Sequence, residues 1–531
     1  MPAKEKCPMT KKRRTFSAEF KREAAGPPIA WRSAAVVKSS CQPGLASHQG
    51  QAVETRGDTA AEEKNYDLSL RYDPALAFKL APHRHPFVAS LLLRHAGLLK
   101  ELSRGFGSPL HIVFPQIFTE NVQRFRRVFA ENGLTGTILY AKKANKADTF
   151  AQACAQLGIG IDVASIGEFT KALAAGVRGE RIGISGPEKT DGLLNLALRH
   201  GGLIAIDSLS ELRRLAVLAA ASGTTARVLL RFRPPGQASS RFGLTATEYR
   251  AALECCTSQK GCIRLEGFSF HLSGYSIEKR AEFAGQLIEL CLQAQALGFK
   301  TCGQIDLGGG LPVQYVDPEQ WRRFLQQDAA AHYHAGKTFS GFYPYGAVRH
   351  GADALRDLLN CPTGGGTSLA QKARRHGVEF IIEPGRALLD QAGLTLFKVL
   401  GVKDRHVGEG YGYGYGYGIV TVQGSSLSLS EQWFNSEYLP DPQLLGAAEN
   451  EGQVFLACVG GSTCLEGDML TWRKIGFPAP VQPGDRLVYL NTAGYQMDSN
   501  ESPFHEAILP SKVVVELHGE PLAPHWHLDG I

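Results

Sequence analysis

Between residues 136 and 382 the sequence alternates short apolar segments with intervals long enough for a helix. Parallel strands cannot be joined by tight turns and need long crossover connections, so this alternation predicts a parallel sheet. Eight such units favour a closed (β/α)8 barrel of the TIM type over an open sheet. The expected strands are residues 136–140, 160–163, 181–184, 203–206, 227–232, 264–270, 303–307 and 378–382.

After residue 395 the sequence changes to short runs of β-forming residues. This change predicts an all-β second domain. The fold class is therefore α/β, with a barrel at residues 105–395 and a β-rich domain formed by residues 66–104 and 396–531. The expected strands of that domain are Leu396–Val402, Ile419–Val422, Val454–Val459, Arg486–Leu490 and Val513–Leu517.

Two segments lack the pattern of a folded element. Residues 1–25 hold eight Lys and Arg against three Glu, so most of the net charge of +6 lies there. Within this stretch, residues 12–23 resemble the N-terminus of an insertion-sequence transposase, but no recognition helix follows. We interpret residues 1–65 as a disordered leader, and nucleic-acid binding rests on this leader alone. The Gly-Tyr repeat at 410–418 is typical of a low-complexity loop.

The composition excludes several classes of protein. An apolar fraction of 44% with 20% charged residues is typical of a globular chain. No apolar run approaches the roughly 20 residues of a membrane-spanning helix, and the N-terminus lacks the apolar segment of a signal peptide. The eleven cysteines include no Cys-x-x-Cys pair and no zinc-finger spacing. These features predict a cytoplasmic protein with reduced thiols and without a membrane or metal partner.

The segment Tyr140-Ala141-Lys142-Lys143-Ala144-Asn145-Lys146 follows the first expected barrel strand. A lysine at the C-terminal mouth of a buried strand is desolvated, which lowers its pKa and makes the neutral amine a nucleophile toward an aldehyde. Adjacent strand residues point to opposite faces, so only one of the two neighbouring lysines can face the barrel axis.

Further motifs follow later strands, at the end of the barrel where active sites form. Three consecutive glycines let backbone N–H groups approach a phosphate without interference from Cβ atoms. A carboxylate beside an arginine, after the last strand, suits a charged cofactor. The motifs are Asp162 in the second strand, His271-Leu272-Ser273-Gly274 after the sixth, Gly308-Gly309-Gly310 after the seventh, and Glu383-Pro384-Gly385-Arg386 after the eighth.

These motifs, in this order, resemble those of the ornithine/diaminopimelate decarboxylase family, fold type III of the pyridoxal-phosphate enzymes, which writes its lysine segment Tyr-Ala-x-Lys-Ala-Asn. The resemblance implies that Lys143, not Lys142, carries the cofactor as an aldimine. It also implies that Asp162 tunes this lysine and that His271 stacks on the cofactor ring. In the family, Glu383 would face the pyridine nitrogen and make the ring a stronger electron sink.

The resemblance extends to the phosphate and to the β-rich domain. It implies phosphate contacts from the three glycines, from Gly385 and Arg386, and from Tyr495 in Ala493-Gly494-Tyr495. Arg231 matches a family arginine near the cofactor. Cys464, in Gly461-Ser462-Thr463-Cys464, matches a cysteine that reaches the active site of the partner subunit, where this cysteine or a nearby acid would reprotonate the product. A homodimer with shared active sites is therefore implied.

Three departures from the family pattern bear on the substrate. The family usually writes His-x-Gly-Ser, whereas Ser273 and Gly274 stand here in the opposite order, which puts the phosphate contact of the serine in question. Leu465 replaces the acid that follows the cysteine, and Gln423 replaces the aspartate of an Asp-Gly pair. Both latter changes remove negative charge from the expected pocket, which disfavours ornithine, lysine and arginine.

The sequence therefore predicts a pyridoxal-phosphate-dependent amino-acid decarboxylase that acts on a small molecule, a diamino-acid derivative being the favoured substrate. An amino-acid racemase of the same barrel class and a non-enzymatic pyridoxal-phosphate-binding protein are the alternatives. The cysteine and histidine motifs favour decarboxylation over racemisation, and residues 396–531 are superfluous for a barrel-only cofactor carrier.

Overall fold

The computed structural model describes residues 78–364, 366–405, 416–430, 432, 435–447, 455–519 and 523–530. The predicted leader at 1–65, with its transposase-like segment, and most of the Gly-Tyr repeat lie outside the described residues. Everything described belongs to one unit, Asp67–Ile531. No helix in these ranges is long and apolar enough to cross a membrane.

Eight parallel strands close into a barrel in the order of the sequence, which confirms the predicted fold class. Each strand lies within one residue of its predicted bounds at either end. The prediction is accurate because short continuous apolar runs, separated by helix-length intervals, are typical of buried parallel strands. The strands are β2 (Gly136–Ala141), β3 (Gly160–Val163), β4 (Ile182–Ile184), β5 (Leu203–Ile206), β6 (Ala226–Phe232), β7 (Ile263–Phe270), β8 (Gln304–Asp306) and β9 (Glu379–Ile382).

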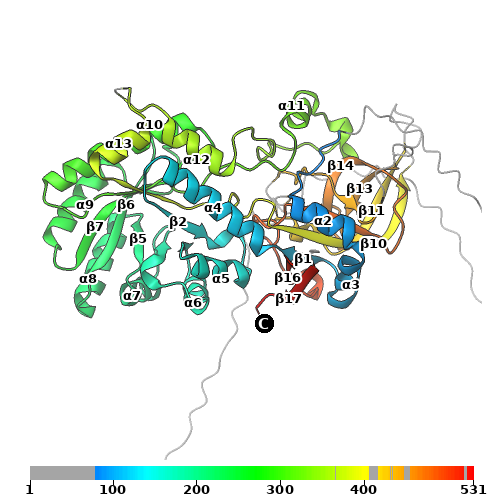
Figure 1. The fold of residues 1–531 in the computed structure, drawn as a ribbon, viewed down its shortest axis with the longest axis horizontal. Helices are drawn as coiled ribbons and strands as arrows, with labels where there is room; N and C mark the ends of the chain where they lie inside the picture. Colours follow the sequence, from blue (N-terminus) through cyan, green and yellow to red (C-terminus); the bar gives the residue numbers. More distant parts are fainter. Residues whose placement is uncertain are drawn as a thin grey trace, which may run out of the picture. The chain divides into compact units, whose positions relative to one another are not determined.

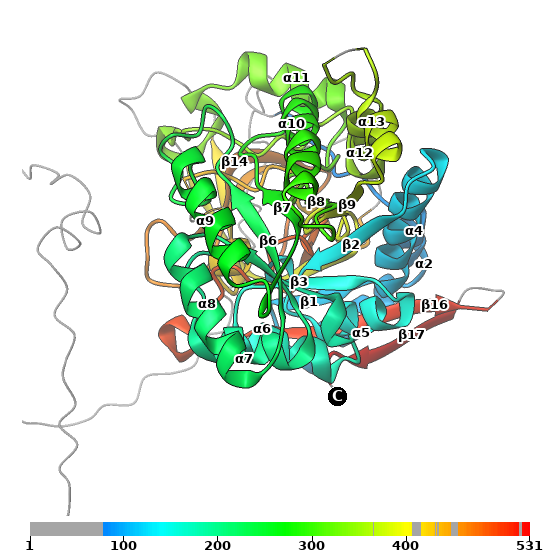
Figure 2. The ribbon, with the colours of Figure 1, turned by 90° about the vertical axis from the view of Figure 1, so that its left-hand side faces the viewer.

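Helices surround the barrel strands (Figures 1 and 2). Several begin at a serine or threonine whose hydroxyl accepts a backbone N–H of the first turn, such as Ser165 at α6 and Ser276 at α10. The helices around the barrel are α4 (Pro115–Glu131), α5 (Asp148–Leu157), α6 (Ile166–Ala174), α7 (Asp191–His200), α8 (Leu209–Ser222), α9 (Ala246–Ser258), α10 (Ile277–Ala296), α12 (Gly351–Asn360) and α13 (Leu369–His376). A further helix, α11 (Pro318–Gln327), packs instead against the β-domain core through Trp321 and Phe324.

A second, mostly antiparallel sheet of nine strands forms the predicted β-rich domain. Two strands of this sheet, β14 and β17, were not predicted. Arg473 and Lys474 interrupt the apolar residues of β14, and His and Pro residues interrupt those of β17, so neither strand has a continuous apolar run. The strands are β1 (Leu110–Val113), β10 (Gly393–Arg405), β11 (Tyr417–Gln423), β12 (Gln443–Leu444), β13 (Phe455–Gly460), β14 (Met469–Phe477), β15 (Arg486–Leu490), β16 (Ser511–His518) and β17 (Ala523–Leu528).

The start of the predicted barrel range, residues 105–395, belongs to this second sheet instead. β1 pairs antiparallel with β10 and parallel with β16, so all four of its residues are buried in the β-domain. Before it come two helices, α2 (Pro86–Arg94) and α3 (Ala96–Phe106). Arg486 Nε on β15 donates to Ser103 Oγ on α3 at 2.7 Å. The chain therefore enters the β-sheet once before it builds the barrel.

Candidate active site

A cavity of about 180 Å³ opens at the C-terminal ends of the barrel strands. It unites side chains from four separate sequence motifs and from the β-rich domain. Its lining residues are Lys143, His271, Tyr275, Gly309, Gly310, Leu311, Tyr343, Glu383, Pro384, Gly385, Arg386 and Tyr495.

The two neighbouring lysines after β2 point to different surroundings. Lys143 lines the cavity with its side chain half exposed, and its Nζ lies 3.2 Å from Asp162 Oδ2 at the end of β3. Lys142 is only 1% exposed, and its Nζ donates to the carbonyl oxygens of Lys146 and Ala147 at 3.0 and 3.3 Å. Of the two amines, only that of Lys143 faces the cavity.

The pKa of the cavity lysine differs from the sequence-based expectation. The Asp162 carboxylate, with smaller contributions from Glu383 and Tyr495, raises the pKa of Lys143 well above its ordinary value, and this outweighs the opposing desolvation. Burial lowers the pKa of Lys142 instead. The prediction of a lowered pKa at Lys143 was wrong because strand position alone does not reveal an acid on the neighbouring strand.

Three carboxyl groups gather near Lys143. Asp162 is 2% exposed, and its Oδ1 has no hydrogen-bond partner among the described residues. Burial, followed by repulsion from Asp162 and Asp306, raises the pKa of Glu383 well above its ordinary value. Burial likewise raises the pKa of Asp306 to about 6, and its side chain hydrogen-bonds with that of Glu383. The raised pKa favours the protonated form of Glu383, which is the form that can donate a hydrogen bond.

The three glycines form a turn that no larger residue would fit. Gly308 and Gly310 have φ values of 69° and 77°, a region costly for other residues. A Cβ at Gly309 would lie 2.8 Å from the Glu383 carbonyl oxygen. Asp306 Oδ1 accepts the Gly308 N–H at 2.8 Å and so fixes the start of the turn. The resulting backbone cradle leaves room for an anionic group.

Arg280 supports this turn from α10, and no sequence motif identified it. Its side chain is 3% exposed, and Nη1 donates to the carbonyl oxygens of Leu307 and Gly309 at 2.8 and 2.7 Å. Burial lowers its pKa to about 10, so the guanidinium stays charged at neutral pH. Among the described residues no carboxylate forms an ion pair with it. Its positive charge is available to an anion bound at the glycine turn. The only sequence signal was an arginine on an otherwise apolar helix face.

Arg386 and Tyr495 both line the cavity. The Arg386 guanidinium carbon lies 3.9 Å from the ring centre of Tyr343 and 5.0 Å from that of Tyr495. A Cβ at Gly385 would lie 2.7 Å from the Tyr495 hydroxyl, so only glycine allows this tyrosine to pack against the loop. The arginine is therefore held between two aromatic rings at the cavity.

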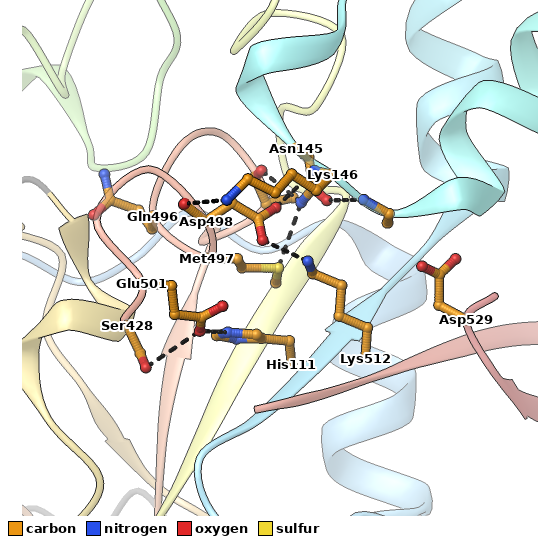
Figure 3. Close-up of polar contacts among 12 residues, drawn as sticks. His111, Asn145, Lys146, Ser428, Gln496, Met497, Asp498, Glu501, Lys512 and Asp529 are labelled. Carbon is orange, nitrogen blue, oxygen red and sulfur yellow. Dashed lines mark hydrogen bonds and ion pairs between the residues drawn. The ribbon is translucent and has the colours of Figure 1, made fainter. Parts of the chain in front are cut away.

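Hydrogen bonds attach the lysine segment to the β-domain segment that carries Tyr495 (Figure 3). Asn145 Nδ2 donates to the Ala493 carbonyl oxygen at 2.9 Å, and the Lys146 N–H donates to Asp498 Oδ2 at 2.7 Å. Lys512 Nζ on β16 lies 2.5 Å from Asp498 Oδ1. Lys143 and Tyr495 are thus held at a defined separation although they lie far apart in the sequence.

His271 lines the cavity as a neutral ring. Desolvation, then the charges of Arg280, Lys143 and Arg231, lower its pKa to about 4.

Some predicted cofactor residues of the barrel do not line the cavity. Arg231 is one of them, and its Nη1 contacts Asp207 Oδ1 at 3.0 Å. Ser273, in the exchanged Ser-Gly pair, is exposed and does not line the cavity either. Gly308, which precedes the lining residues Gly309 and Gly310 in the sequence, is not among the lining residues either.

The predicted β-domain residues Cys464, Leu465 and Gln423 are described, but none of them lines the cavity of its own chain. All three are exposed. Cys464 lies on the loop between β13 and β14, where its Sγ is 3.2 Å from His505 Nε2. Gln423 ends β11, and its backbone oxygen accepts the Ser108 hydroxyl at 2.8 Å.

The sequence of this chain matches known proteins over most of its length. Residues 116–341 match the family model of the pyridoxal-dependent decarboxylase pyridoxal-binding domain. The chain is 37% identical over 452 residues to the uncharacterized protein y4yA of Sinorhizobium fredii, covering 83% of this chain and 95% of that protein. The chain belongs to the pyridoxal-dependent decarboxylase family. Pyridoxal phosphate is therefore its cofactor.

Members of the family with assigned names are more distant. The diaminopimelate decarboxylase of Halalkalibacterium halodurans is 26% identical over 420 residues, which cover 75% of this chain and 85% of that enzyme. The diaminopimelate decarboxylase of M. jannaschii, solved with L-lysine, is 20% identical with a TM-score of 0.62 and covers 78% of this chain and 89% of its own. That structural likeness shows the shared fold.

The cavity fits this cofactor at each of its chemical groups. The glycine turn, backed by the unpaired charge of Arg280, suits a phosphate. The Glu383 carboxyl, whose pKa is raised, suits a pyridine nitrogen, and Asp162 Oδ1, which has no hydrogen-bond partner among the described residues, offers a further acceptor. Lys143 is the amine in the cavity that can reach an aldehyde.

Replacing Arg280 with methionine should weaken cofactor binding about 10-fold or more, because hydrogen bonds to a charged group contribute about 1.5–3 kcal/mol. Titration of apoprotein with pyridoxal phosphate, followed by absorbance, measures the change. Arg349→Met provides the control, since Arg349 is an exposed arginine paired with Asp357. Equal affinities in the two variants would show that Arg280 has no part in holding the phosphate turn.

Proposed function

We propose that this protein decarboxylates an amino acid, with Lys143 as the residue that binds pyridoxal phosphate covalently. The observation that carries the proposal is the set of groups that meets at the cavity around Lys143. Beside the Lys143 amine lie a glycine turn supported by the Arg280 guanidinium and the Glu383 carboxyl, whose pKa burial raises. This arrangement complements a phosphorylated pyridine, and the named relatives of the chain are decarboxylases.

When bound, pyridoxal phosphate accepts the electron pair that the departing carboxylate leaves behind. The residues of this chain prepare the site for that chemistry. Asp162 Oδ2 holds the Lys143 ammonium at 3.2 Å and can accept its proton when the amine reacts. Glu383, with its raised pKa, would share a proton with the ring nitrogen of the bound cofactor, and His271, whose pKa is lowered to about 4, would offer that ring a neutral imidazole.

The distal end of the substrate is proposed not to be a simple free ammonium. Leu465 and Gln423 stand where the family has acids, and an unpaired buried ammonium costs several kcal/mol. A neutral, bulky or carboxylate-bearing distal group suits these side chains better. A diamino-acid derivative is accordingly favoured over ornithine, and diaminopimelate stays a candidate.

The activity is tested by incubating the holoenzyme with ornithine, lysine, arginine, diaminopimelate and conjugated diamino acids while measuring released CO₂ and amine products. We expect decarboxylation with the highest kcat/KM for a substrate without a free distal ammonium. Racemised amino acid without CO₂ would replace this proposal with a racemase. Efficient ornithine decarboxylation would contradict only the substrate argument.

Borohydride treatment of the holoenzyme should fix the cofactor on Lys143, because this amine alone of the two faces the cavity. Peptide mapping of the reduced protein locates the label. Lys143→Ala should abolish labelling, whereas Lys142→Ala, the matched control, should retain it if the variant folds. A label on Lys142 would overturn the assignment.

A mixture of two inactive variants should recover activity if the enzyme is a homodimer with shared sites. Cys464 is exposed and lies outside its own cavity, so we propose that it donates the proton to the product in the partner's site. Lys143→Ala and Cys464→Ala, dissociated together and reassociated, should reach up to about a quarter of wild-type activity, since random pairing makes half of the dimers mixed, each with one intact site. No recovery, or full activity in a monomer, would contradict this arrangement.

A further inference from the structure

A second cavity of about 240 Å³ lies outside the cofactor site. One wall is the exposed face of α4, another is the amino end of α12, and a third is the segment 387–390 that follows the Glu383–Arg386 loop. The proposed reaction uses none of these residues. Its occupant must therefore be inferred from the charges that line it.

The α4 wall and the α12 end are cationic. Arg124 and Arg127 are three residues apart on α4 and so share one face of the helix. Neither forms an ion pair with any described residue, unlike the nearby Arg356, which contacts Glu131 at 3.1 Å and also pairs with Asp353. The amino end of α12 at Gly351 adds a partial positive charge. This side of the cavity suits a carboxylate.

The wall formed by segment 387–390 carries a buried acid with one unsatisfied oxygen. Asp390 is 6% exposed, and its Oδ1 has no hydrogen-bond partner among the described residues. Asn121 Nδ2 donates to the carbonyl oxygens of Leu388 and Asp390 at 3.1 and 2.9 Å, which fixes the backbone that presents this acid. Burial raises the pKa of Asp390 to about 7, although Arg124 and a hydrogen bond with the Gln391 side chain oppose the shift. A cationic or hydrogen-donating group beside it would satisfy the carboxylate.

We propose that this cavity binds a free α-amino acid, with the carboxylate at Arg124 and Arg127 and the ammonium at Asp390. An α-amino acid carries a carboxylate and an ammonium, so it can contact arginine and aspartate side chains of one cavity at once. A simple anion would leave Asp390 Oδ1 without a hydrogen-bond partner.

The cavity is connected to the cofactor site by one short turn. The Leu388 and Leu389 N–H groups donate to the carbonyl oxygens of Gly385 and Arg386, each at 3.1 Å. Gly385 and Arg386 line the cofactor cavity, whereas Ala387 and Asp390 line the second one. An amino acid at Asp390 is therefore placed to alter the loop that holds the cofactor, as an effector would.

The test uses holoenzyme reduced with borohydride, so that amino acids cannot react at the cofactor. Equilibrium dialysis with radiolabelled L-lysine, L-arginine and L-glutamate should give saturable binding of at least one of them, at one molecule per chain. Arg124→Gln with Arg127→Gln should weaken binding at least 10-fold, and so should Asp390→Asn. Arg323→Gln, which removes an exposed arginine on α11, should bind like the wild type.

Absence of binding by all three amino acids would overturn the proposal, as would unchanged binding in the double arginine variant, whose altered side chains are exposed and need not affect folding. Displacement by glutarate as effective as by the amino acid would show an anion site in its place. Failure of borohydride to fix the cofactor would count against Lys143 as the attachment residue. The double arginine variant, dialysed without reduction, would then still decide whether the second site binds.

Discussion

The carboxylate of Asp498 connects the two halves of the active site. It accepts the Lys146 N–H with one oxygen and contacts the Lys512 ammonium with the other. Burial alone would raise the pKa of this acid, but Lys512 and the Lys146 amide lower it below its ordinary value. The acid therefore stays ionised while only 2% exposed. Because of this contact, the barrel lysine and the β-domain tyrosine form one site.

Within that site several buried charged or titratable groups lack a full set of partners. Asp162 pairs with Lys143, but burial, followed by repulsion from Asp162 and Asp306, raises the pKa of Glu383 well above its ordinary value. Arg280 is buried, and its Nη1 donates to carbonyl oxygens. Such an arrangement is unfavourable without a ligand, since buried charges normally need a partner. A bound molecule with an anionic group and a basic nitrogen would offer a partner to the guanidinium and to the carboxyl.

The sequence was sufficient for the parts of the fold that depend on local pattern. The barrel strands are continuous apolar runs between helices, and that pattern predicts them closely. β14 escaped because Arg473 is buried there, where it contacts Asp441 at 2.5 Å, a partner that the pattern cannot show. β1 was assigned to the barrel because its partners lie nearly 300 and 400 residues away.

The same limit applies to the site. Family motifs pointed to many of the residues that line the cavity, from Lys143 to Tyr495, but not to Tyr275 or Tyr343. They did not identify Arg280, whose role arises from the backbone oxygens it meets after folding. The pKa of Lys143 was also misjudged, because it depends on the distance to Asp162 and not on strand position. Contacts between distant segments, more than residue type, decide these properties.

The placement of β1 also affects the order in which the chain can fold during synthesis. β1 ends at Val113, but its parallel neighbour β16 begins at Ser511, roughly 400 residues later. At about 5–20 residues per second, the ribosome needs roughly 20–80 s to make that interval. The barrel strands are complete by Ile382, so the barrel can close before either partner of β1 has been made, and the edge that pairs with β16 waits longest. An unpaired strand edge invites wrong pairing, which makes this interval the period when a nascent chain most needs protection by chaperones.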